Sequence, residues 1–266
     1  MATSVSMADM DAIIRLWRFA KSAYFPDEKQ WAADAMQAYL KGFSIRIVSK
    51  SNMAVTLAKG DKEFVVSYAG TNDVDDVIIA LKSLRRVPYP HSASPTFIAE
   101  GFFNGFNVVR SEVLLACEEA HREGLNISVT GHSAGAAYAL ILADTLARQG
   151  IICSNVIAFE SPRVFGPKLA KRLSTVLKDS RVIRVTHGSD PVPHVPLFFR
   201  FRHVGDELWL PRAYGKRAVL NPNVFRQLWG FFKGISQKGV ADHKVSNVSP
   251  RLTWEHSYMR GLIDGK

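Results

Sequence analysis

Apolar positions along this chain fall into two patterns, short strand-like runs and longer segments of helical period. Strands are predicted at residues 43–48, 54–58, 63–68, 127–129, 151–159 and 181–185. Helices are predicted at residues 10–24, 101–122, 136–148 and 167–177, most of them ended by a glycine or a proline. From residue 101 onwards helices and strands alternate. This order predicts an α/β fold with a mostly parallel sheet and helices on both of its faces.

The clearest chemical signal lies where a predicted strand meets a predicted helix, in the order Gly131-His132-Ser133-Ala134-Gly135. A G-x-S-x-G turn in this position forces the serine backbone into a strained conformation and presents its hydroxyl. The flanking glycines let strand and helix approach closely. Ser133 is therefore the candidate nucleophile, and the start of the helix offers N–H groups and a positive dipole end above it.

The partners of such a serine follow it in the order acid, then histidine, in folds of this kind. Asp190 stands just past a predicted strand end, before prolines that fix the loop, so it is the candidate acid. Of the later histidines, His194 is too close to the acid and His203 lies in a predicted edge strand. We select His256, which precedes an apolar terminal helix, and keep His243, in a polar loop, as the alternative.

Residues 72–84 form a short segment that has two interpretations. Val74, Val77, Ile78 and Leu81 lie at i, i+3, i+4 and i+7, so they share one face of a short helix. On this periodicity alone, the face is expected to pack permanently on the core. The alternative is a lid over the catalytic serine that opens at a lipid surface.

Composition sets outer bounds on the class of protein. The chain has 266 residues, 47% of them hydrophobic, which suffices for a single domain with a full core. We find no apolar run long enough to span a membrane, and residues 1–10 lack the features of a secretory signal. We therefore expect a cytoplasmic protein, or export by a non-classical route. Cys117 and Cys153 are expected to be buried free thiols.

The net charge of +10 is unevenly distributed. Residues 1–167 hold 16 Lys and Arg against 17 Asp and Glu, whereas residues 168–266 hold 18 against 7. Such a bias suits nucleic acid or an anionic membrane surface, or it only aids solubility, and no nucleic-acid motif accompanies it. The basic part includes an insertion of unclear role at residues 211–247. Its aromatic and basic stretch, 225–233, packs on the core or lies on anionic lipid.

Several motifs together make the chain similar to the class 3 (fungal-type) lipase family of α/β-hydrolases over about residues 54–262. They are Tyr68-Ala69-Gly70-Thr71, Ile98-Ala99-Glu100-Gly101-Phe102, Gly131-His132-Ser133-Ala134-Gly135, Phe159-Glu160-Ser161-Pro162-Arg163-Val164, Asp190-Pro191-Val192-Pro193 and His203-Val204-Gly205-Asp206-Glu207-Leu208-Trp209. The resemblance implies that Asp190 is the acid, that the histidine before the last helix is the base, and that residues 72–84 are the lid.

The sequence departs from the family pattern at four positions. Ala69 replaces an arginine and Ala99 a histidine, side chains that brace the oxyanion turn in the family. Glu160 and Ala136 each replace a glycine. None of these changes removes a reacting group, so they bear on pocket shape and rate more than on reaction type.

The resemblance implies an enzyme that hydrolyses lipid esters, as a triacylglycerol lipase or a phospholipase A1, through an acyl-enzyme. Ser133, His256 and Asp190 form the expected triad, and the N–H groups of Ala134 and Thr71 the expected oxyanion hole. No metal or organic cofactor is required. The expected partner is the lipid ester, with peripheral contact to an anionic membrane or lipid-droplet surface. A short-chain carboxylesterase, an acyltransferase and a catalytically silent lipid-binding module remain as alternatives.

Overall fold

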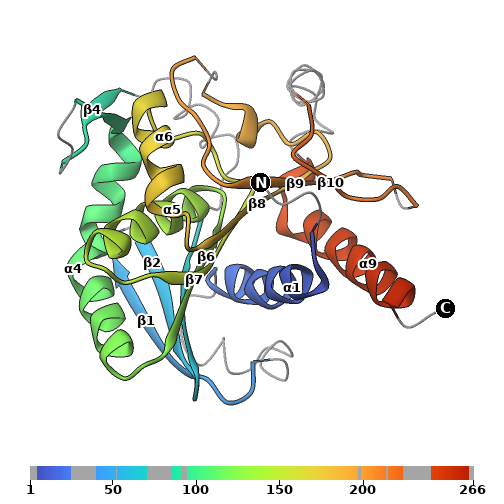
Figure 1. Ribbon diagram of the computed structural model, residues 1–266, viewed down its shortest axis with the longest axis horizontal. Coiled ribbons are helices and arrows are strands. Elements are labelled where there is room, and N and C mark those ends of the chain that lie inside the picture. Colours follow the sequence, from blue (N-terminus) through green and yellow to red (C-terminus); the bar gives the residue numbers. More distant parts are fainter. Residues whose placement is uncertain are drawn as a thin grey trace.

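The computed structural model describes residues 5–24, 40–51, 53–70, 85–90, 95–196, 199–213, 215–223 and 241–263. Within these ranges the main sheet has eight strands (Figure 1). They are β1 (Ser44–Lys50), β2 (Met53–Lys59), β3 (Glu63–Tyr68), β6 (Asn126–His132), β7 (Cys153–Phe159), β8 (Arg181–His187), β9 (Asp206–Leu210) and β10 (Val219–Leu220). A separate small sheet pairs β4 (Arg86–Pro88) with β5 (Phe97–Ala99).

The strands of the main sheet lie in the order β1-β2-β3-β6-β7-β8-β9-β10. All neighbouring pairs from β3 to β9 are parallel. The pairs β1–β2, β2–β3 and β9–β10 are antiparallel. Because parallel strands require a crossover connection, a helix precedes each of β6, β7 and β8 in the chain. The carboxyl ends of the central strands therefore meet at one edge of the sheet.

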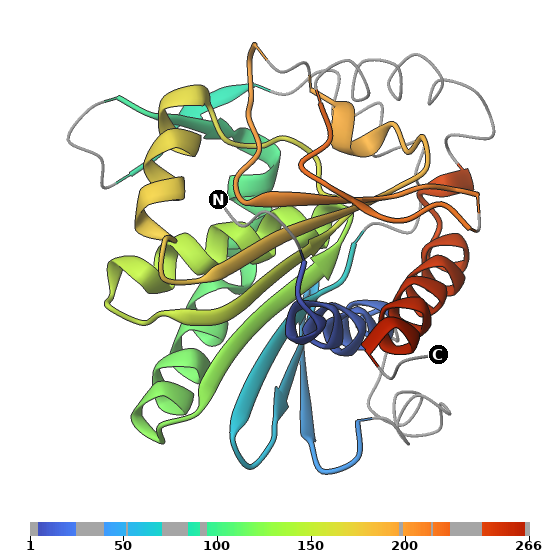
Figure 2. The same ribbon diagram turned by 45° about the vertical axis from the view of Figure 1, so that its right-hand side comes forward.

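Helices cover both faces of this sheet (Figure 2). They are α1 (Met7–Ser22), α4 (Glu100–Arg122), α5 (Ala134–Arg148), α6 (Pro167–Val176) and α9 (Val245–Ile263), with a short 3-10 helix, η2, at Val192–His194. The helices α4, α5 and α6 pack on the face of the sheet that carries the Val66 side chain. The helices α1 and α9 pack on the opposite face, which carries the Val65 side chain. Successive strand residues point to opposite faces, so the central strands serve two separate cores.

The predicted fold class is confirmed, since a mostly parallel sheet carries helices on both faces. The expected burial of Cys117 and Cys153 as free thiols is confirmed as well. The segment predicted to be a lid, residues 72–84, lies outside the described residues, and so do residues 214 and 224–240 of the insertion at 211–247, including its aromatic and basic stretch at 225–233. In its described part this insertion supplies β10, which extends the sheet beyond β9. None of the helices in the described ranges has the length and apolar character that crossing a bilayer requires.

Candidate active site

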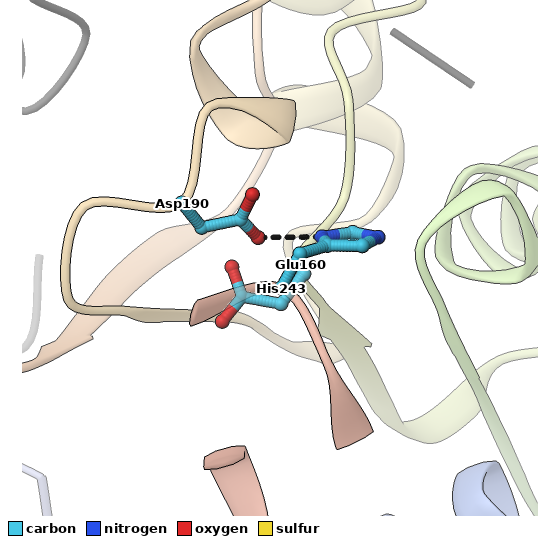
Figure 3. A group of neighbouring side chains, drawn as sticks. All are labelled: Glu160, Asp190 and His243. Atoms are coloured by element: carbon cyan, nitrogen blue, oxygen red, sulfur yellow. Dashed lines mark hydrogen bonds and ion pairs between the residues drawn. The ribbon is translucent and has the colours of Figure 1, made fainter. Parts of the chain in front are cut away.

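Four side chains of chemical interest gather at the carboxyl ends of the central parallel strands. Ser133 follows β6, Glu160 follows β7 and Asp190 follows β8 after a short turn. His243 comes from a distant part of the sequence, just before α9. Figure 3 shows Asp190, Glu160 and His243 converging. This edge of a parallel sheet is where α/β folds bind their ligands, so the position suits an active site.

The turn at Ser133 has the strained geometry that the sequence predicts. Ser133 has φ 56° and ψ −124°, a conformation that non-glycine residues rarely adopt. Strand and helix come so close that a Cβ on Gly131 would lie under 3.0 Å from the Gly135 backbone. A Cβ on Gly135 would come equally close to the Tyr68 carbonyl. The Ser133 N–H donates to the Phe159 carbonyl at 2.9 Å, which ties the turn to β7.

The Ser133 hydroxyl is buried and makes no hydrogen bond to any of the described residues. A buried polar atom without a partner is unusual and calls for a functional reason. Ala134 begins α5 directly beside it. Because the first N–H groups of a helix have no intrahelical acceptor, the Ala134 N–H suits the predicted role of donor to an oxyanion.

Five residues of the predicted site lie outside the described residues, namely Thr71, Val74, Val77, Ile78 and Leu81. The oxyanion and lid roles given to them stay predictions. Gly70, which precedes Thr71 in the chain, is described and lies against the turn, since a Cβ on it would be 3.2 Å from the Ser133 Cβ. Gly70, the last described residue before this segment, therefore lies at the site.

Asp190 and His243 are hydrogen-bonded to each other. The His243 Nδ1–H donates to Asp190 Oδ2 at 2.6 Å, and both side chains are almost completely buried. Asp190 Oδ1 accepts from the Val192 N–H at 2.9 Å. Burial alone would raise the pKa of Asp190, but the charge and hydrogen bond of His243 outweigh it, so this pKa is lowered and the group is ionised. When Nδ1 carries the only proton of an imidazole ring, the lone pair that can accept a proton lies on Nε2.

The histidine of this pair is His243 and not His256, so the sequence-based choice is corrected. His256 lies within α9, and its Nε2 is 2.7 Å from Asp11 Oδ1 on α1. The rule behind the choice, a histidine just before the last helix, holds, because α9 begins at Val245. That start escapes detection because Pro250 and several polar residues interrupt the apolar pattern of the first turns.

The segment that carries His243 is anchored by the residue before it. Asp242 Oδ2 accepts from the Ser189 N–H at 2.7 Å, and Asp242 Oδ1 accepts from the Arg212 Nε–H at 2.8 Å. The Asp242 carbonyl accepts from His187 Nδ1–H at 3.2 Å. Sequence analysis offers no signal for Asp242 beyond its place next to His243. These bonds fasten His243 to the loop that carries Asp190.

His132, inside the Ser133 turn, links the turn to His243. Its Nε2 lies 3.0 Å from the His243 carbonyl oxygen, so Nε2 carries the proton and donates. Its Nδ1 then accepts from the Tyr24 hydroxyl at 2.7 Å, and Tyr24 has a backbone hydrogen bond with Gly70. Burial, and next the proximity of His243, lower the pKa of His132 to about 3, so its ring is neutral. Tyr24, which the sequence indicates only as part of a helix face, thus supports the site.

Glu160, Asp190 and His243 also have ligand atoms within 4.8 Å of one another, as a metal site requires. The direct hydrogen bond between Asp190 and His243, however, joins two of the atoms that would bind the ion. The arrangement therefore fits a network that shares protons better than a site that holds a cation.

Comparisons with known proteins point to one family. The family model described as Lipase (class 3) matches residues 65–200, just over half of the chain. Secreted mono- and diacylglycerol lipase A from Penicillium cyclopium is 31% identical over 166 residues, which cover 61% of this chain and 50% of that protein. Phospholipase A1-IIbeta from Arabidopsis thaliana is 33% identical over 141 residues, which cover 48% of this chain and 33% of that protein. The chain thus spans half or less of these two curated relatives.

Solved structures share the fold. The Rhizomucor miehei lipase in its propeptide complex gives a TM-score of 0.76, covering 91% of this chain and 80% of that chain at 22% identity. A second structure, described as a fungal lipase, gives 0.75 over 92% of this chain and 100% of that chain at 21% identity. At these identities the likeness shows the architecture and not the chemistry.

The first prediction concerns the glycine contact at the turn. Gly131→Ala is expected to lower the free energy of unfolding by roughly 1–3 kcal/mol, because the new methyl group meets the Gly135 backbone. Gly101→Ala is the matched control, since its Cβ meets nothing within 4 Å, and it is expected to be neutral or stabilising by up to ~1 kcal/mol. Urea denaturation of both variants checks this. Equal effects in the two would contradict the steric account.

The second prediction concerns acid stability. The unfolded chain protonates His132 below about pH 6.5, whereas the folded chain resists protonation until about pH 3, so stability falls as the pH drops through this window. His132→Gln keeps a donor for the His243 carbonyl but has no group that titrates in this window. The variant should therefore lose this contribution, which is a change of up to about tenfold in the unfolding constant per pH unit. Urea denaturation between pH 4 and 7 measures the slopes. Identical slopes for wild type and variant would refute the assignment of a neutral His132.

Proposed function

Because the chain belongs to the class 3 lipase family, we propose that it hydrolyses carboxylic esters of lipids through Ser133, His243 and Asp190. The observation that carries the proposal is the 2.6 Å hydrogen bond between Asp190 and His243 at the sheet edge where the strained Ser133 turn also lies. The proposed nucleophile, base and acid thus come from three separate segments that meet at this edge of the sheet. A catalytically silent lipid-binding module has no need for this convergence.

In the proposed mechanism, Ser133 Oγ attacks the ester carbonyl while His243 Nε2 takes the hydroxyl proton. Asp190 stays ionised throughout, holds the ring in its Nδ1-protonated form and stabilises the imidazolium. His243 then passes the proton to the leaving alcohol, and the acyl group remains on Ser133. Water attacks this acyl-enzyme with Nε2 as base, which releases the acid and restores the serine.

The negative oxygen of each tetrahedral intermediate needs hydrogen-bond donors. The Ala134 N–H at the start of α5 is the first proposed donor. The second is Thr71, through its N–H and hydroxyl, which the family resemblance implies. One such donor is worth ~2.7–4 kcal/mol in the transition state, since a preorganised dipole costs no reorganisation there.

The substrate class is proposed from the relatives. They include proteins named as a mono- and diacylglycerol lipase and as a phospholipase A1. From these relatives we propose that this chain has an activity of the triacylglycerol lipase or phospholipase A1 type. A short-chain carboxylesterase would prefer short acyl chains in the same assay. An acyltransferase would lose hydrolysis when an alcohol is added, because the alcohol competes with water for the acyl-enzyme.

The third prediction tests the roles of the residues. Ser133→Ala and His243→Ala are each expected to lower kcat for p-nitrophenyl ester hydrolysis by about 10³-fold or more, since each removes a reacting group. His256→Ala is the matched control and should keep its activity, because the His256 ring contacts Asp11 on α1 and not Asp190. Labelling with a fluorophosphonate should fail only in Ser133→Ala and His243→Ala. Loss of activity in His256→Ala with retention in His243→Ala would reverse the assignment of the base.

The proposal also includes contact with an anionic lipid surface. Phe199 is 62% exposed, and it is followed by Arg200 and by the exposed Arg202. These residues belong to the loop that leads on from Asp190 through η2. Arg202 in this loop pairs with Phe165, which follows the carboxyl end of β7, the edge of the sheet that carries the site. Exposed aromatic and basic side chains together are typical of contact with a charged lipid interface.

The fourth prediction tests this surface with vesicles of anionic phosphatidylglycerol. Phe199→Ala is expected to weaken binding by about threefold or more, because burial of the ring in the interface is lost. Ile152→Ala is the matched control, since Ile152 is 54% exposed but precedes β7 at the opposite edge of the sheet. Cosedimentation measures the binding, which should fall with salt and with neutral lipid. Equal binding by Phe199→Ala and wild type would remove this part of the proposal.

A further inference from the structure

Glu160 is a buried acid beside the Asp190–His243 pair that the proposed mechanism leaves unused. It has a positive φ of 51° and a side chain with no exposed surface. Its carboxyl oxygens make no hydrogen bond to the described residues, yet one lies within 4.8 Å of the ligand atoms of both neighbours. Figure 3 shows the Glu160 carboxyl group facing that of Asp190. Since glycine adopts this backbone conformation at less cost, the glutamate side chain needs a reason to be there.

The surroundings of Glu160 hold charges of both signs. The titratable groups near it are Asp190 from the loop after β8, and Asp242 and His243 from the segment before α9. The His187 backbone also acts on it, and the His132 ring lies tilted beside that of His243. The charge of Asp242 is offset by its ion pair with Arg212. Asp190 is therefore the neighbouring acid whose negative charge acts most strongly on Glu160.

Two neighbouring carboxylates cannot both be ionised in a closed site without a large cost. Asp190 accepts hydrogen bonds from His243 and from the Val192 N–H, and both bonds favour its charged form. For Glu160 the His187 backbone N–H is the one described group that favours the charged form, and it is outweighed. Burial, and next the charge of Asp190, raise the pKa of Glu160 well above its usual value. The proton of this acid pair therefore resides on Glu160.

We propose that Glu160 is a positioning residue, a neutral carboxylic acid whose O–H points at Asp190 and acts on His243 through it. This inference rests on the proposed function, because it concerns the same reaction at Ser133. Glu160 keeps its proton throughout the cycle. The protons that move are those exchanged among Ser133, His243, the leaving alcohol and water.

The neutral acid has two effects on its partner. A hydrogen bond from Glu160 orients the Asp190 carboxylate toward the imidazole, because a buried carboxylic acid that stays neutral can act as a hydrogen-bond donor. It also keeps the pair at a single negative charge, which matches the single positive charge of the imidazolium formed during attack. A second negative charge would hold the proton on His243 and slow its transfer to the leaving alcohol.

A proton held on Glu160 in the folded chain makes the free energy of unfolding depend on pH. In the unfolded chain Glu160 ionises above about pH 4.5, whereas in the folded chain it stays protonated, so the unfolded state binds fewer protons. Stability therefore falls as the pH rises from this value toward the folded-state pKa, by up to about tenfold in the unfolding constant per pH unit. Glu160→Gln cannot ionise and lacks this loss.

The fifth prediction follows from this difference. Urea denaturation at pH 5, 6, 7 and 8 should show Glu160→Gln gaining stability relative to wild type as the pH rises. Glu207→Gln is the matched control, because Glu207 is buried but paired with Arg184 at 3.3 Å. This control should be less stable than wild type and show no such gain. A pH-independent difference between Glu160→Gln and wild type would show that Glu160 holds no proton and would overturn the inference.

The positioning role has a separate readout in the kinetics. Glu160→Ala is expected to lower kcat for p-nitrophenyl butyrate by about tenfold or more, with little change in KM, because Asp190 loses its support. Glu160→Gln restores a donor for Asp190 and should recover most of that loss. Both variants keep a Cβ at the same positive φ, so backbone strain is matched. Equal losses in kcat, or an effect confined to KM, would overturn the positioning role.

Failure of the inference and failure of the proposed function can be told apart. If wild type neither hydrolyses esters nor reacts with a fluorophosphonate, the proposed function fails and the positioning role fails with it. The denaturation series still reports whether Glu160 carries a proton in that case. If wild type is active and the Ala and Gln variants are equally impaired, only the inference on Glu160 falls.

Discussion

The close approach of β6 and α5 at Ser133 is the constraint on which the site depends. Gly131 and Gly135 face each other there without side chains, and Gly135 also lies against the end of β3. The Ser133 N–H then bonds to the carbonyl of Phe159 in β7. One steric requirement thus fixes the candidate nucleophile, the positive end of a helix and the ends of three strands relative to one another.

The other groups reach this fixed point from loops, and hydrogen bonds hold them there. Asp242 ties the His243 segment to the loop after β8, while His132 ties it to the turn and to Tyr24. These polar contacts lie in a largely buried region, where each satisfied bond is strong and each broken one is costly. Such a network gives the loops a defined position that their short or irregular backbone could not supply alone.

How far the sequence predicts this site depends on how local each signal is. The Ser133 turn is local because its defining residues are consecutive, and Asp190 is local because it follows its strand directly. The histidine is not local, since its identity depends on where α9 begins, and Pro250 hides that start. Tyr24 reaches His132 across 108 positions, a contact that leaves no trace in either neighbourhood. The sheet and its helices are predictable because each strand and each helical turn repeats the same spacing of apolar residues.

The first and last described helices lie side by side, and the hydrogen bond from His256 to Asp11 joins them (Figure 1). Both helices fall outside residues 65–200, the stretch by which the family is identified. That stretch contains Ser133 and Asp190, whereas His243 and Tyr24 come from its flanks. The match to the family model therefore covers only part of the proposed reaction centre. A fragment trimmed to residues 65–200 would keep Ser133 and Asp190 but would lack His243, the proposed acceptor of the serine proton.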